Sequence, residues 1–104
     1  MASTWEAVGA HALAIQEHTL GPEHPTLATS LHNLALLYAA QGRYAQAEPL
    51  YTRALAIWEH ALGSQHPTVA TSLEHLATLY RHTGREQEAE ALEKRAHAIR
   101  AIVR

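Results

Sequence analysis

The sequence lacks cysteine and phenylalanine altogether, and aromatic residues make up only 6% of its 104 residues. Without cysteine, the chain can form no disulfide framework, no thiolate zinc site and no cysteine nucleophile. The β-branched and aromatic residues that strands favour are scarce, whereas the helix-favouring alanine (21 residues) and leucine (14 residues) dominate the apolar set. These proportions argue against a β-sandwich or a β-barrel and predict an all-α fold.

Charge of one sign and long apolar runs are also missing. Eight Lys and Arg against ten Asp and Glu give a formal net charge of −2, which predicts no general attraction to nucleic acid or to anionic membranes. No run approaches the roughly 20 apolar residues that span a bilayer, and the first residues lack the basic segment of a secretory signal. We therefore expect a cytoplasmic protein with no nucleic-acid partner and no membrane partner.

An internal repeat with a period of 42 residues organises the chain. Residues 12–53 aligned with residues 54–95 are identical at 25 of 42 positions. The shared positions include the tripeptide His-Pro-Thr, which occupies residues 24–26 and again residues 66–68. Such self-similarity is typical of repeat proteins, in which each structural unit packs on the next one.

Each repeat unit has the pattern of two consecutive helices. In the first unit, one helical face collects Leu27, Leu31, Leu34, Ala35 and Tyr38. A proline suits the start of this helix and a glycine suits its end. Applied along the chain, the pattern predicts helices near residues 3–20, 25–41, 44–62, 67–83 and 86–102.

The short loops between these helices predict antiparallel hairpins that stack into a solenoid. The organisation that we expect is a single domain over residues 1–104. Within it, residues 1–20 form a half repeat that matches only the second helix of a unit, residues 25–62 form the first repeat, and residues 67–104 form the second.

The residue pattern of each unit resembles the tetratricopeptide repeat. The motif Leu31-x2-Leu34-Ala35-x2-Tyr38, followed by Ala47-x3-Tyr51, matches that signature, with Leu in place of Trp, Ala in place of Gly and Tyr in place of Phe. The 42-residue period and the segment His-Pro-Thr-x-Ala-Thr-Ser-Leu are similar to the repeats of kinesin light chain and its bacterial relatives. The resemblance implies a right-handed superhelix of about two and a half repeats that acts as a non-catalytic scaffold for protein–protein interaction.

The resemblance also implies that the first helix of each hairpin lines a concave groove. Transferred position by position, the implied peptide-binding set is His32, Asn33, Leu36, Ala39, Ala40, Glu74, His75, Thr78, Arg81 and His82. The first helices of the two units differ mainly at these positions, whereas their core positions agree, so we expect the set to lie on the accessible face. Asn33 would bond to a peptide main chain, Arg81 would pair with a carboxylate, and Leu36 with two alanines would form an apolar floor.

The nine histidines raise the question of a metal site. His18 and His24 recur as His60 and His66, so their number reflects duplication. Equivalent residues on stacked hairpins lie ~8–10 Å apart, too far to share an ion that needs ligands at ~2.0–2.1 Å. The four serines stand in no nucleophile-elbow motif, and the glycines form no phosphate-binding loop. We predict no metal site, no cofactor and no enzymatic activity.

An alternative interpretation is a structural module that associates with itself. The half repeat at residues 3–20 lacks the first helix of its own pair, so it could stack against helix 86–102 of another chain and form a homo-oligomer.

In the second unit, Glu93 replaces Tyr51 and His97 replaces Leu55, which is typical of a capping unit. The sequence leaves the peptide-binding scaffold and the self-associating module both open.

Overall fold

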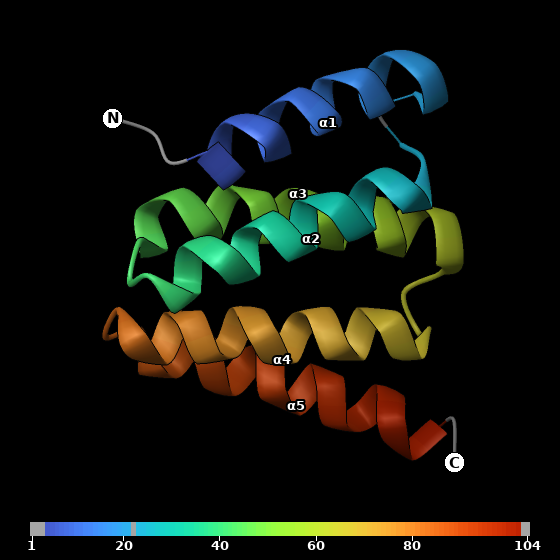
Figure 1. Cartoon of the computed structure of the whole chain (residues 1–104). Helices are drawn as coiled ribbons and strands as arrows, with labels where there is room; N and C mark the ends of the chain where they lie inside the picture. Colours follow the sequence, from blue (N-terminus) through green and yellow to red (C-terminus); the bar gives the residue numbers. More distant parts are fainter. Residues whose placement is uncertain (1–3, 22, 103–104) are drawn as a thin grey trace.

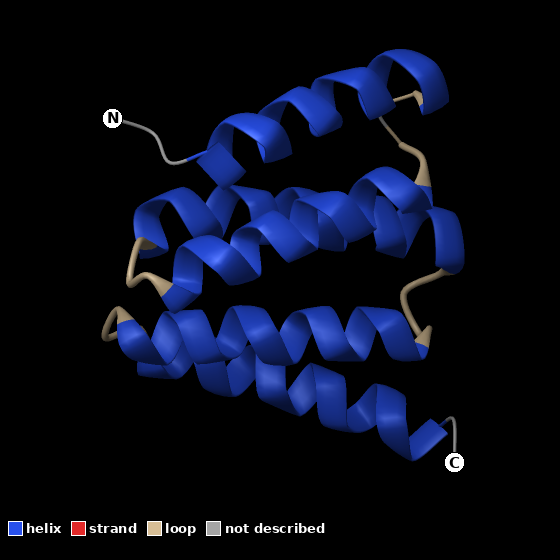
Figure 2. Cartoon of the chain, viewed as in Figure 1, coloured by secondary structure: helices blue, strands red, loops and turns tan. Residues whose placement is uncertain are grey.

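The computed structural model describes residues 4–21 and 23–102, which form five α-helices and no strand (Figure 1 and Figure 2). The helices are α1 (Thr4–Leu20), α2 (Pro25–Ala40), α3 (Tyr44–Leu62), α4 (Pro67–His82) and α5 (Glu86–Ile102). The all-α prediction is confirmed, and the predicted helix bounds agree with these to within one residue. Residue 3, where the first helix was expected to begin, lies outside the described residues.

The helices stack as antiparallel hairpins (Figure 1). Helix α2 packs on α3 and α4 packs on α5, while α3 contacts α4 across the junction of the two hairpins and α1 packs on α2. Helices α1 and α5 therefore lie at opposite ends of the stack (Figure 1). The Cα atoms extend over 40 × 31 × 17 Å, and the smallest extent fits two layers of helices at the usual separation of ~8–10 Å.

The two hairpins begin with the same cap, formed by repeated histidines. The Nδ1 atom of His24 accepts a hydrogen bond from the backbone N–H of Thr26, and His66 accepts one from Thr68, both at 3.1 Å. In each case the intervening proline stands in the first turn, where its missing N–H removes no hydrogen bond. These two histidines thus satisfy backbone donors that helix starts leave unpaired.

Glycines end the helices where the pattern placed them. Gly42 follows α2 with φ of +74°, and Gly63 follows α3 with φ of +94°. Both angles lie in the left-handed region, which costs a residue with a Cβ atom more than it costs glycine. Each hairpin can therefore turn within a few residues.

The core consists largely of positions that the two units share. Leu31 and its repeat equivalent Leu73 are both buried, as are the equivalent alanines Ala35 and Ala77. Alanine at such positions lets a neighbouring helix approach closely, and leucine fills the remaining space. The repeated residues therefore provide the scaffold on which the site is built.

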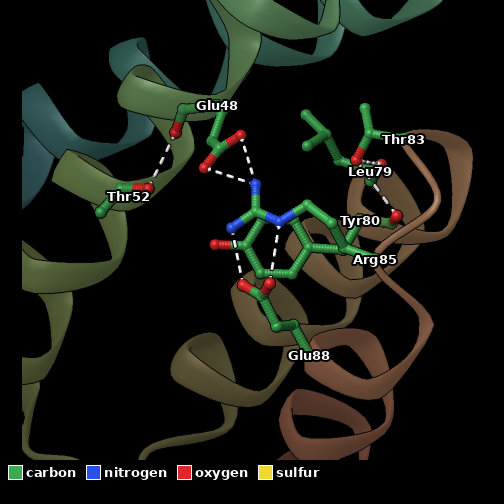
Figure 3. A network of polar contacts seen from close by, with 7 residues as sticks. All are labelled: Glu48, Thr52, Leu79, Tyr80, Thr83, Arg85 and Glu88. Carbon is green, nitrogen blue, oxygen red and sulfur yellow. Dashed lines mark hydrogen bonds and ion pairs between the residues drawn. The ribbon is translucent and has the colours of Figure 1, made fainter.

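Arg85, which directly precedes α5, ties the second hairpin to the first (Figure 3). Its Nη1 donates to both carboxylate oxygens of Glu48 on α3, at 2.8 and 2.9 Å, and its Nη2 donates to Glu88 at 2.6 Å. The guanidinium carbon also lies 3.8 Å from the centroid of the Tyr80 ring. The Glu88 and Glu48 carboxylates together raise the pKa of Arg85.

An Arg–Glu ion pair between second helices occurs twice, at positions 42 residues apart. Arg53 on α3 pairs with Glu17 on α1, and 42 residues later Arg95 on α5 pairs with Glu59 on α3, with 2.6 Å between Nη2 and Oε2 in the second case. Both pairs join the second helices of successive units. The same contact therefore recurs between α1 and α3 and between α3 and α5.

Candidate peptide-binding groove

A pocket of about 270 Å³ lies where α2, α3 and α4 meet, and we call it the central pocket. It is lined by Leu36, Ala39, Ala40, Tyr44, Tyr51, His75, Thr78, Leu79 and His82. The two alanines stand in the last turn of α2, and their small side chains leave the space that the surrounding rings enclose. No carboxylate, lysine or arginine contributes to this lining.

Aromatic rings from different helices set the shape of the central pocket. Tyr44, at the start of α3, stacks on His82 at the end of α4, with ring centroids 5.3 Å apart and planes 8° apart. Tyr51, two turns further along α3, is 2% exposed, and burial raises the pKa of its phenol. Rings from α3 and α4 thus line the pocket together, and one pair of them is stacked.

Six of the ten predicted site residues meet at the central pocket: Leu36, Ala39, Ala40, His75, Thr78 and His82. Asn33 does not line it, but this residue is exposed on α2, one turn before Leu36 on the same helical face. Three lining residues were missed, namely Tyr44, Tyr51 and Leu79. Tyr44 could have been found from the sequence, because it differs from its repeat equivalent Glu86. The same kind of difference between the units had indicated the other residues of the accessible face.

His32 is not on the accessible face, contrary to expectation. Its side chain is 7% exposed, and its ring lies 5.1 Å from the Tyr51 ring and 5.3 Å from the Trp58 ring, measured between centroids. Its Nε2 atom is 2.7 Å from Nδ1 of His75, across the junction of the hairpins. Burial, together with the neighbouring His75, lowers the pKa of His32 to about 4.

Arg81 and Glu74 are engaged elsewhere in the chain. The Arg81 guanidinium pairs with Glu86 and Glu93 on α5, and the Glu93 carboxylate raises the pKa of Arg81. Glu74 accepts hydrogen bonds from Arg100 Nε at 3.0 Å and Nη2 at 2.7 Å, which lower the pKa of this carboxyl group. Neither residue lines the central pocket, so the predicted role of Arg81 in binding a carboxylate would require it to leave an existing partner.

Among the side chains that the structure describes, those of residues 9, 12–21 and 23–102, no three of His, Cys, Asp or Glu are grouped so that they could hold a metal ion. In the same part of the chain, none of the helices combines the length and the apolar character needed to cross a bilayer. Three buried side-chain polar atoms there have no hydrogen-bond partner, and one of them, Nδ1 of His32, belongs to the histidine pair below the central pocket.

Comparisons with known proteins agree with the helical-hairpin architecture. A sequence model of the tetratricopeptide repeat matches residues 6–59 and residues 27–101. Among solved structures, BtubC (BKLC) from P. vanneervenii superimposes with a TM-score of 0.88 at 28% sequence identity over 94% of this chain. The present chain spans 39% of the length of that protein. A comparison with curated proteins gave no match.

Proposed function

Since the chain belongs to the tetratricopeptide repeat family, whose members are generally non-catalytic scaffolds for protein–protein interaction, we propose that it binds a peptide segment of a cytoplasmic partner protein in the groove between its hairpins. The central pocket would take one large apolar side chain of that segment. Asn33, exposed on the same face of α2, would hydrogen-bond to the peptide main chain.

The observation that carries this proposal is the composition of the central pocket. Its lining combines small alanines, a leucine that is 38% exposed and several aromatic rings, and it contains no carboxylate, lysine or arginine. Apolar pockets with a few polar groups are the usual sites for anchoring side chains of a ligand. Because Arg81 is paired with Glu86 and Glu93, the proposal assigns it no contact with the peptide.

The alternative, self-association through helices 3–20 and 86–102, has less support. The outward surface of α5 carries Glu90, Glu93, Lys94 and His97 around a shallow depression. Glu93 there is already paired with Arg81 of the same chain. An interface there would have to cover these charged side chains, which are depleted at the cores of protein–protein interfaces. Sedimentation at several concentrations distinguishes the two cases, because only the alternative requires an oligomer.

The proposal is tested with a random peptide display library and a variant that fills the central pocket. Ala40→Trp places a large ring in the pocket at an exposed end of α2, where it disturbs no buried packing. We expect peptides selected on the wild-type protein to lose at least about tenfold in affinity for this variant, the equivalent of about 1.4 kcal/mol.

The matched control is Ala98→Trp, because Ala98 is an exposed alanine on α5 that does not line the central pocket. It should leave peptide affinity unchanged, and both variants should retain the helical circular dichroism of the wild type. Equal losses in the two variants, or selected peptides that bind Ala40→Trp normally, would place the binding surface elsewhere.

A further inference from the structure

A hydrogen bond joins His75, which lines the central pocket, to the buried His32. Nε2 of His32 on α2 lies 2.7 Å from Nδ1 of His75 on α4. At this distance one nitrogen donates and the other accepts, so the neutral pair has two arrangements. Either both rings carry their proton on Nε2 and His32 donates, or both carry it on Nδ1 and His75 donates.

The surroundings of His32 decide between these arrangements. Its Nδ1 is buried and has no hydrogen-bond partner in the described part of the chain. A proton on this atom would create a buried N–H without an acceptor, and such groups are rare in proteins. The Nε2–H form is also the more stable neutral form of free histidine. Both considerations favour the arrangement in which His32 donates through Nε2 and His75 accepts through Nδ1.

This arrangement determines what His75 offers to the groove. With Nδ1 bonded to His32, which is the one hydrogen bond found for this ring in the described part of the chain, the remaining polar atom is Nε2, which then carries a proton. His75 lines the central pocket. Its free N–H therefore lies beside an apolar pocket that holds no other titratable donor on α4 except His82.

We propose that His32 is a positioning residue that fixes His75 in its Nε2–H form, so that the floor of the groove offers a hydrogen-bond donor to a main-chain carbonyl of the bound peptide. The identity of the acceptor rests on the proposed peptide-binding function, whereas the proton arrangement of the pair does not. The preferred ligand is then an extended peptide with an exposed carbonyl next to its apolar anchor.

The titratable groups that face the pair come from α3 and α4. Tyr51 on α3 is a neutral phenol. Glu74 on α4 is held by Arg100 on α5, so its carboxylate is already compensated. Helix α2 itself carries no carboxylate and no guanidinium group. Burial and the neighbouring His75 lower the pKa of His32 to about 4, so the His32 ring stays neutral in mildly acidic solution.

The decisive measurement is the long-range ¹H–¹⁵N spectrum of the wild-type protein labelled with [¹⁵N]histidine, recorded without ligand at pH 7.5. The pattern of one- and multiple-bond couplings identifies which ring nitrogen carries the proton. We expect His32 and His75 to show the pure Nε2–H pattern. An Nδ1–H pattern at His75, or a mixture like that of an exposed histidine such as His60, would overturn the inference.

Two substitutions at His32 separate positioning from packing. In His32→Gln the side-chain amide can donate from nearly the same place as Nε2, whereas His32→Leu fills the space without a donor. We expect His75 to keep the Nε2–H pattern in His32→Gln and to become a mixture of both forms in His32→Leu. His60→Gln, at an exposed position on α3, serves as the control and should leave the His75 signals unchanged. Identical His75 spectra in all three variants would contradict the positioning role.

The ligand part is tested with a peptide selected on the wild-type protein. His32→Leu should weaken its binding about tenfold, as expected for one hydrogen bond, and His32→Gln should restore most of the affinity. If no peptide binds the wild type while His75 shows the Nε2–H pattern, the proposed function fails and the proton arrangement stands. If peptides bind but His75 carries its proton on Nδ1, only the present inference fails. Should His32→Leu not fold, the wild-type spectrum and the His32→Gln variant still test the proton arrangement of His75.

Discussion

The two hairpins differ most at the surface that each turns toward the C-terminal end of the stack. In the first hairpin this surface carries Tyr51, Leu55 and Trp58, and all three are buried. In the second hairpin the equivalent positions carry Glu93, His97 and Arg100, and none of them is buried. Helix α4 packs against the first surface, whereas no helix of the described chain packs against the second.

The polar surface of the second hairpin is compensated within the chain. Glu93 pairs with Arg81, and Arg100 pairs with Glu74, which is the repeat equivalent of buried His32. The positions of the repeat thus have two separate structural roles. Positions common to both units build each hairpin, and positions that differ adapt its outer surface either to a neighbouring helix or to water.

The largest expected effect comes from exchanging residues between the two surfaces. Tyr51→Glu would place a carboxylate without a partner at a position that is 2% exposed, and we expect it to lower the free energy of unfolding by about 4 kcal/mol or more. The reverse change, Glu93→Tyr, should alter it by no more than about 1 kcal/mol, because the lost ion pair with Arg81 is exposed. Urea unfolding followed by circular dichroism measures both, and similar losses would mean that the two surfaces are equivalent after all.

Truncations in the shared core should affect the two hairpins alike. Leu31 and Leu73 are repeat equivalents with exposed fractions of 1% and 0%. We expect Leu31→Ala and Leu73→Ala each to cost about 2–5 kcal/mol of unfolding free energy, through lost apolar burial and the cavity that remains. A difference between them of more than about 2 kcal/mol would show that the repeated sequence does not produce equally packed cores.

The pH dependence of stability should separate His32 from its repeat equivalent Glu74. His32 has its pKa lowered from the ordinary 6.5 to about 4 in the folded chain, so the unfolded chain binds the proton first. The neutral His32 therefore contributes to the free energy of unfolding in full above pH 6.5. This contribution, about 3 kcal/mol at most, is lost as the pH falls toward 4. Glu74, whose pKa the Arg100 hydrogen bond lowers, contributes only above its ordinary value of 4.5 and loses that contribution at lower pH.

Urea unfolding at a series of pH values distinguishes these two contributions. In His32→Gln the slope between pH 6.5 and 4 should become shallower, because the amide does not titrate. Glu74→Gln should leave that slope in place and reduce the change at lower pH. An unaltered slope in His32→Gln would show that His32 is not the group responsible.

The smallest effect is expected for the ion pairs that recur at the repeat spacing. The partners of the Arg53–Glu17 and Arg95–Glu59 pairs are about one-third to two-fifths exposed. Double-mutant cycles with alanine should therefore give coupling energies of about 0.2–1 kcal/mol for each pair, with similar values for the two. A clearly larger coupling energy in one pair would indicate that the two helices it joins depend on their ion pair more than the other two helices do.

Local pattern was sufficient to predict the helices and most of the core. Leu31 and Ala35, with their equivalents Leu73 and Ala77, are buried as their spacing predicts, because helical periodicity alone decides which residues share a face. Divergence between the units also indicated part of the site, since Leu36 and Thr78 differ in sequence and both line the central pocket. Both sets of positions follow from the sequence without the packing of one hairpin on the other.

The error at His32 concerns a side chain whose environment comes from other helices. Divergence marked His32 as accessible, yet it is buried, because Tyr51 and Trp58 of α3 and His75 of α4 enclose it. Divergence also marked Arg81, which is exposed as expected, but its guanidinium pairs with carboxylates on α5. A position that differs between repeats can change because it contacts a ligand or because its neighbours in the stack change, and sequence comparison does not separate these causes.

The chain's residues by themselves determined the helices, their caps and the repeated core, since hydrogen bonding within a helix and the burial of one apolar face depend on neighbours a few positions away. Only the packing of α2, α3 and α4 against one another decided which side chains enclose the central pocket and which histidine lies beneath it. Those contacts join residues about 40 positions apart, as in the hydrogen bond between His32 and His75. Their geometry follows from the angle and distance at which the hairpins pack, and no local pattern specifies these.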